Sequence, residues 1–237
     1  MSQQLLQERF FQALIHGDRH SARAVVDECF AASAPAETIL EKLFWPVYET
    51  LQRLHRDDQL SDVCHNFATR LLRMLAAQVQ PRLAIGPRNG RRVLLVGGPR
   101  EGEEIAAQIA ADMLEAGGYD IFFAGGGVAH DEVLAQIAQL HPQVLVLFGN
   151  APADLPHIRQ LIDELHKQGG SPSMQIVVGG GVFNRAEGLA EEIGADLWAP
   201  TPLELVKAIR AAPQQRMIVE QRTVGRRRRS HLTIAAA

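Results

Sequence analysis

The sequence predicts an α/β protein in which an N-terminal four-helix bundle precedes a doubly wound, parallel, five-stranded sheet. From residue 91 to residue 211, short apolar runs alternate with longer stretches of helical periodicity. Glycines follow several of these runs, at the points where a parallel strand ends and its helix begins. Before residue 80 there are four amphipathic stretches with short breaks between them, which is the pattern of a small helical bundle.

The bundle is expected to form a cap domain over residues 1–80. Apolar side chains spaced for one helix face predict helices over residues 3–16, 18–32, 35–54 and 61–80. Asp18 and either Ser61 or Asp62 are suitable N-caps. Pro46 falls inside the third stretch, where it should kink the helix or begin a new segment. The stretch 81–90, PRLAIGPRNG, has the composition of a linker.

The second domain is expected over residues 91–212. Its strands are predicted at residues 93–97, 119–124, 143–149, 174–179 and 195–198. Its helices are predicted at residues 102–116, 130–140, 155–168, 184–193 and 202–211. Regular alternation of this kind is typical of a flavodoxin-like sheet, which binds ligands at the carboxyl ends of its strands.

Glycines gather at those strand ends, in the clusters Gly97-Gly98, 125–127, Gly149 and 179–181. A backbone without Cβ atoms can approach a flat or phosphorylated ligand closely, so the clusters predict a binding crevice. Glycines also end strands that bind nothing, and that interpretation stays open.

Composition limits the setting in which the protein works. The chain has 237 residues, 46% hydrophobic and 22% charged, which is ordinary for a globular protein. It has only two cysteines, Cys29 and Cys64, and no CxxC pair, which indicates a reducing compartment without a disulfide framework. The N-terminal residues MSQQLLQERF do not form a signal peptide, so we expect a cytoplasmic protein.

The charge is distributed unevenly along the chain. Residues 213–237 carry six arginines and one glutamate, a net charge of +5, whereas the rest carries 18 basic and 26 acidic residues, a net charge of −8. This basic tail, with its run Arg226–Arg229, is expected to be disordered. It is either an arm for nucleic acid or an acidic partner, or a solvated segment that aids solubility.

Several catalytic motifs do not occur in the sequence. There is no GxxxxGK[ST] loop, no GxGxxG fingerprint and no GxSxG elbow. The nine histidines form neither HxH nor HExxH, so a zinc site is not expected. These observations favour a binding protein over an enzyme.

The stretch VVGGGVFN, followed by IGAD, resembles the cobalamin-binding module found in methionine synthase, corrinoid proteins and light-sensing repressors. Over residues 5–211 the order of helical cap and flavodoxin-like domain is similar too. The resemblance assigns cofactor contacts to Gly98, to Gly149-Asn150 in place of Ser-x-Leu, and to Gly102-Glu103 of PxGExHxxG. It places Gly179, Gly180 and Gly181, followed by Val182 and Phe183, beside the nucleotide tail of the cofactor.

One position departs from this family. The histidine that binds cobalt from below falls on Ile105, and the family's next glycine falls on Gln108. An isoleucine cannot coordinate a metal, so the usual His-on form of the cofactor is not expected. This argues against a corrinoid methyl carrier.

In the cap, light-sensing relatives carry Trp-His and, nine residues on, Glu-His, where this chain has Leu54-His55 and Cys64-His65. Neutral imidazole is a common ligand of cobalt and iron. The resemblance therefore makes His55 the candidate axial metal ligand from above, with His65 as second choice or supporting partner. A histidine that merely packs between helices is the alternative for each of them.

In plan, the resemblance is closest to the regulators of purple-bacterial photosynthesis genes of the AerR and PpaA type. It implies a sensor that binds cobalamin, or another tetrapyrrole such as haem, and controls a partner such as a transcription factor through movement of the cap. A biliverdin-binding photoreceptor module, with Cys64 as attachment point, and an interaction scaffold without ligand remain alternatives.

Overall fold

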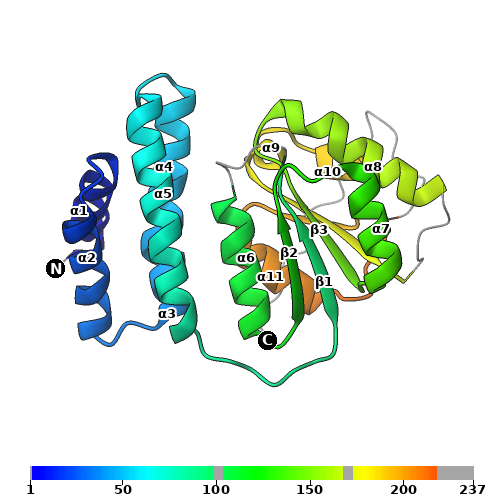
Figure 1. Ribbon diagram of the computed structural model, residues 1–237, viewed down its shortest axis with the longest axis horizontal. Helices are drawn as coiled ribbons and strands as arrows, with labels where there is room; N and C mark the ends of the chain where they lie inside the picture. Colours follow the sequence, from blue (N-terminus) through cyan, green and yellow to red (C-terminus); the bar gives the residue numbers. More distant parts are fainter. Residues whose placement is uncertain (1, 99–103, 168–172, 218–237) are drawn as a thin grey trace.

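The computed structural model describes residues 2–98, 104–167 and 173–217. The chain forms a helical cap and an α/β domain that lie side by side, joined by a single connecting segment at one end (Figure 1). The predicted fold class is confirmed. None of the described helices is both long and apolar enough to span a membrane.

The cap consists of four helical rods. The first, second and fourth rods are α1 (Gln3–Ile15), α2 (Arg19–Ala31) and α5 (Asp62–Val79). The third rod is continuous through α3 (Ala36–Ile39), η1 (Leu40–Phe44) and α4 (Trp45–Arg56). Asp18 caps α2 through the N–H groups of His20 and Ser21, and Ser61 caps α5 through that of Cys64. The short helix η2 (Gln80–Arg82) ends the cap.

Pro46 does not end the third rod. The five residues before α4 form a π-helical turn, in which the N–H of Trp45 bonds to the carbonyl of Leu40. Because proline has no N–H, the carbonyl of Lys42 four residues earlier would lack its helical partner. The side-chain amides of Gln3 and Gln7 donate to that carbonyl, at 3.2 and 2.7 Å. Side chains of α1 therefore supply hydrogen bonds to the carbonyl that Pro46 leaves without a helical partner.

The α/β domain has five parallel strands in the order β2-β1-β3-β4-β5. They are β1 (Arg92–Val96), β2 (Asp120–Gly125), β3 (Val144–Phe148), β4 (Gln175–Gly179) and β5 (Leu197–Ala199). The helices that alternate with them are α6 (Ile105–Ala116), α7 (His130–Leu140), α8 (Leu155–Lys167) and α11 (Pro202–Ala211). The short helix η4 (Pro152–Asp154) precedes α8.

One predicted helix is divided. Instead of a single helix over 184–193, the structure has α9 (Gly181–Arg185) and α10 (Leu189–Glu192). Ala186, with φ −127° and ψ 105°, ends the first of these helices, and Gly188, with φ 78° in the left-handed region, precedes the second.

Alternate residues of the central strands pack into two separate cores. Val93, Leu95 and Val146 face α6 and α11, whereas Leu94, Leu145 and Leu147 face α7 and α8. The first of these cores continues into the cap, so α6 is covered by the sheet on one side and by cap helices on the other.

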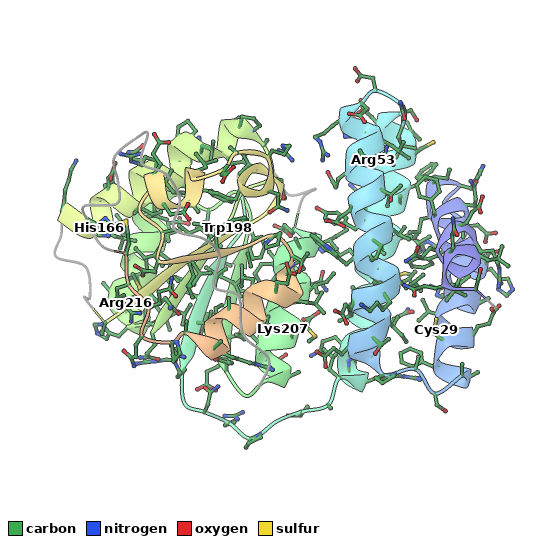
Figure 2. The ribbon with its side chains drawn as sticks, turned by 180° about the vertical axis from the view of Figure 1, so that it is seen from behind. Cys29, Arg53, His166, Trp198, Lys207 and Arg216 are labelled. Atoms are coloured by element: carbon green, nitrogen blue, oxygen red, sulfur yellow. The ribbon has the colours of Figure 1, made fainter. Side chains whose placement is uncertain are left out.

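Polar contacts also join the cap to the α/β domain at this junction between the two. Gln80 donates to Glu115 at 3.0 Å, and the Lys207 ammonium lies 3.9 Å from the Glu41 carboxylate. Figure 2 shows Lys207 on the α/β side of the junction and Arg53 near the upper end of the cap helices. The connecting segment is itself attached to the α/β domain, because Gly86 and Asn89 donate backbone hydrogen bonds to Ala116 and Gly118.

Candidate functional site

A cleft of about 790 Å³ lies between α4 of the cap and the loops after β3 and β4. The cap supplies two neighbouring aromatic rings, Trp45 and Tyr48, whose centroids are 5.5 Å apart. The rest of its lining is mostly polar: Glu49, Gln52, Arg53, His55, Arg56, Asn150, Asn184 and Arg185. A volume of this size and a mixture of apolar and polar groups suit a small-molecule ligand.

The two histidines predicted from the sequence lie together at this cleft. His55 on α4 lines the cleft, and its ring stacks on that of His65 on α5, with centroids 4.0 Å apart and planes 13° from parallel. Nε2 of His55 lies 2.9 Å from Oδ1 of Asp62. Since a carboxylate can only accept, Nε2 carries the proton, and the neutral His55 ring has its lone pair on Nδ1.

His65 is held in the neutral form. Burial, and then the charge of His55, lower its pKa from 6.5 to about 4, against a smaller opposing effect of Asp62. The side-chain amide of Gln52 lies 3.2 Å from Nε2 of His65, and the amide nitrogen can only donate, so this His65 nitrogen accepts. The neutral His65 ring therefore stacks on His55 without electrostatic repulsion.

The strand-end loops form the opposite wall. Asn150 and Gly181, both predicted site residues, line the cleft, and the N–H of Gly181 donates to the Asn150 side chain at 3.1 Å. The guanidinium of Arg185 donates to the Asn150 carbonyl at 2.6 Å. The side chain of Asn150 and the guanidinium of Arg185 therefore tie the loop after β3 to the loop after β4.

Other predicted site residues lie elsewhere. Ile105 is 2% exposed and belongs to the core between α6 and the sheet. Val182 and Phe183 are buried on the opposite face of the sheet, and Leu54 is half-buried on α4. Gly149, Gly179 and Gly180 lie at strand ends that pack closely on each other. Gly102 and Glu103 lie outside the described residues, as does the arginine run 226–229.

Gly98 lines a second cavity, of about 530 Å³, between the ends of β1 and β3 and helices α7 and α8. His130 and His157 meet there edge to face, with ring centroids 5.5 Å apart. Asp154 is 1% exposed there, and its Oδ2 accepts from the N–H groups of Asn150 and Ala151, both at 2.8 Å. Asp154 therefore also orders the loop that forms one wall of the cleft.

Sequence reasoning missed Glu104, which connects the two domains. This carboxylate is 7% exposed, forms an ion pair with Arg73 of α5 at 3.0 Å, and accepts from the N–H of Gly126 after β2. Gln52 and Asp62, which orient the histidines, were missed as well. Only their spacing from His55, three residues before it and seven after it, could have suggested them.

Comparison with known proteins identifies both domains. Residues 6–77 and 91–207 match two family models, each described as a B12 binding domain. No curated protein matches the chain.

Solved structures are similar as well, among them the following three. The monomethylamine corrinoid protein of Methanosarcina barkeri has 20% identity and a TM-score of 0.76, and the match covers 87% of this chain and 98% of that one. A cobalamin-binding protein from Desulfitobacterium hafniense DCB-2 has 19% identity and a TM-score of 0.48, covering 87% and 97%. The methanol:cobalamin methyltransferase complex MtaBC of M. barkeri has 15% identity and a TM-score of 0.48, covering 92% and 83%.

The two family models together cover most of the chain and follow the division into cap and α/β domain that the structure has. The chain therefore belongs to the B12-binding domain family, and cobalamin is the cofactor that this membership assigns to it.

Proposed function

We propose that this protein is a sensory or regulatory cobalamin-binding protein, which holds the corrin ring between cap and sheet and controls a partner through the position of the cap. The observation that carries the proposal is the pairing of an ordered His55 on the cap wall of the cleft with a buried Ile105 on the sheet side. Among the residues that the structure describes, the ligand that we propose for a bound metal then comes from the cap.

The cleft suits a corrin ring. Trp45 and Tyr48 line the cap wall and are 9% and 3% exposed, so they add a small apolar area to the cleft, and a corrin ring is flat and largely apolar on its faces. The periphery of the ring carries amide side chains, which can exchange hydrogen bonds with Gln52, Asn150 and Asn184. When bound, the cofactor supplies a cobalt centre whose axial ligands can be exchanged.

His55 is the residue that would hold the metal. Its orientation is fixed by the stack on His65 and by the contact between Nε2 and Asp62, which leaves the Nδ1 lone pair to coordinate.

Ile105 supports a role other than methyl transport. It occupies the position of the family's lower ligand and is packed into the core that joins α6 to the sheet. A carrier that relies on a histidine from that side has no such group here.

The junction offers a route from ligand to cap. A change in the position of His55 acts on α4 and α5, and α5 is attached to α6 through Arg73 and Glu104. A ligand shifts such an equilibrium only by its differential affinity for the two arrangements. The output we propose is contact with a transcription factor. The basic tail is a candidate for contact with that partner or with nucleic acid.

A second candidate ligand is a tetrapyrrole with carboxylates, such as haem or biliverdin. Arg53, Arg56 and Arg185 all line the cleft, and guanidinium groups pair well with carboxylates. For biliverdin, Cys64 in the first turn of α5 is the candidate thioether residue. Colour that persists in the denatured protein, and disappears in Cys64→Ala, would support that attachment.

The test is reconstitution of the full chain with adenosylcobalamin, hydroxocobalamin, haemin or biliverdin, each followed by desalting and an absorbance spectrum. We expect a corrinoid to be retained at about one per chain, the stoichiometry of a single cleft. Small-angle scattering and limited proteolysis should then differ between the free and loaded protein. Retention of haemin or biliverdin alone would show that cobalamin is not the ligand. Identical scattering and cleavage in the free and loaded protein would contradict the proposed movement of the cap.

A further inference from the structure

The glycines at the end of β4 are enclosed by the protein's own side chains. A Cβ on Gly179 would lie 2.8 Å from Cδ1 of Leu205 and 2.9 Å from Cε1 of Phe148. Both distances are far below ordinary van der Waals contact. Phe148 and Leu205 therefore already occupy the space beside Gly179 that a side chain or a ligand would need.

The neighbouring glycines have similar internal reasons. Gly180 has φ 105°, and a Cβ there would lie 2.2 Å from the Gly149 carbonyl oxygen. A Cβ on Gly149 would lie 2.8 Å from Cδ1 of Ile158. Close packing of the ends of β3 and β4 accounts for these glycines without a ligand, so they are not by themselves a sign of a bound nucleotide.

Cobalamin has two parts that need space: the corrin ring, and a nucleotide arm that ends in an aromatic base. The cleft between cap and sheet can take the ring. The region beside Gly179 is occupied by Phe148 and Leu205, which are 3% and 0% exposed and belong to one core. Moving an aromatic ring out of such a core leaves a cavity and exposes a large apolar surface to water, so it is strongly unfavourable.

We propose that this chain binds cobalamin by its corrin ring alone, with the nucleotide arm outside the α/β core and the arm's own base still on the cobalt. Two independent observations agree on this form. The space beside Gly179 is filled, and Ile105 supplies no protein ligand that could displace the base. The inference rests on the proposed binding of a corrinoid in the cleft and specifies the form that is bound.

The first test compares two ligands on the wild-type chain. Cob(II)alamin and cob(II)inamide share the corrin ring, but cobinamide lacks the nucleotide and its base. Titration under anaerobic conditions should give dissociation constants within about threefold of each other. Burial of an aromatic base would instead favour cobalamin by more than about tenfold, and that result would overturn the proposal.

The second test uses electron paramagnetic resonance of bound cob(II)alamin. An axial nitrogen splits the cobalt lines in three, and the His55→Ala variant removes the one protein nitrogen that we place near the metal. In that variant the splitting should persist, because it comes from the ligand's own base. Its loss would show that the base has left the cobalt, which contradicts the proposal even though a corrinoid binds.

Phe148→Ala tests the residue that fills the space, with Val206→Ala as a control that shortens another buried side chain, on α11. We expect Phe148→Ala to favour cobalamin over cobinamide, and Val206→Ala to keep the wild-type ratio. An unchanged ratio in a folded Phe148→Ala protein would contradict exclusion by Phe148. If that variant does not fold, the wild-type comparison still decides. Binding of neither ligand would instead refute the proposed function.

Discussion

The imidazole rings of His55 and His65 lie face to face, 4.0 Å apart and within 13° of parallel. The two residues come from different helices, α4 and α5, and only one of them reaches the cleft. Because His65 is neutral and accepts from Gln52, the stack fixes the His55 ring without electrostatic repulsion. The pair is best described as one candidate ligand and the residue that positions it.

The first prediction concerns stability in acid. The pKa of His65 is about 4 in the folded protein and 6.5 in the unfolded chain. As the pH falls, the unfolded chain therefore binds a proton at His65 before the folded protein does. The free energy of unfolding should therefore fall by up to about 3 kcal/mol between about pH 6.5 and pH 4. Below about pH 4 His65 should cause no further loss, because it is then protonated in both states. Urea unfolding of wild type and His65→Asn at pH 7 and pH 4.5 measures the contribution.

The variant should lose less stability than wild type over this interval. His20→Asn is the matched control, because His20 is an exposed cap histidine. Equal losses in wild type and His65→Asn would mean that His65 does not titrate as described.

The second prediction concerns the junction at Glu104. Glu104→Ala leaves the N–H of Gly126 without its acceptor and removes a buried charge partner, which should cost about 2–3 kcal/mol. Arg73→Ala removes a half-exposed guanidinium and should cost less than about 1 kcal/mol. Urea unfolding measures both values, and hydrogen exchange of Gly126 should rise only in Glu104→Ala. A larger loss of unfolding free energy in Arg73→Ala than in Glu104→Ala would contradict this, and would show that Arg73 makes the main contact.

The third prediction concerns Asp112 on α6. Burial, and then the negative charge of Glu115, raise the pKa of Asp112 to about 7. Since the folded-state pKa lies above the unfolded one, the carboxyl favours folding least at high pH, where it must be charged. Asp112→Asn should stabilise the protein at pH 8 by roughly 1–2 kcal/mol, allowing for partial solvent screening.

The same substitution should have little effect near pH 3, where the folded carboxyl, with a pKa of about 7, and the unfolded one, with a pKa of 3.8, are both mostly protonated. Urea unfolding at the two pH values tests this. Asp27→Asn, on the exposed side of α2, serves as control. Stabilisation that is equal at both pH values would indicate packing, not charge, as its source.

The fold could be predicted from the sequence because its determinants are local. Alternating apolar runs and strand-end glycines predicted the ends of all five described strands to within two residues of their observed positions. Asp18 and Ser61 correctly marked the starts of two helices. The effects of Pro46 and Gly188 were harder to predict. The Lys42 carbonyl in the π-helical turn accepts from glutamines of α1, which are distant in sequence, and the division of α9 from α10 follows from the backbone conformations of Ala186 and Gly188.

The site could be predicted only in part. The spacing of His55 and His65 puts one on each of two neighbouring helices, and the structure brings them together. The role of Glu104 depends on contacts with Arg73 and Gly126, which are distant in sequence. The close packing around Gly179 likewise depends on Leu205, a residue of the last described helix.

The measurement that tests the central claim most directly is the visible spectrum of bound hydroxocobalamin in wild type, His55→Ala and His20→Ala. Coordination by the His55 imidazole should shift the cobalt-dependent bands of the wild-type complex from those of the free ligand. We expect the shift to persist in His20→Ala and to be lost in His55→Ala. A shift that survives in His55→Ala would contradict His55 as the axial ligand and, with it, the proposed route from cofactor to cap.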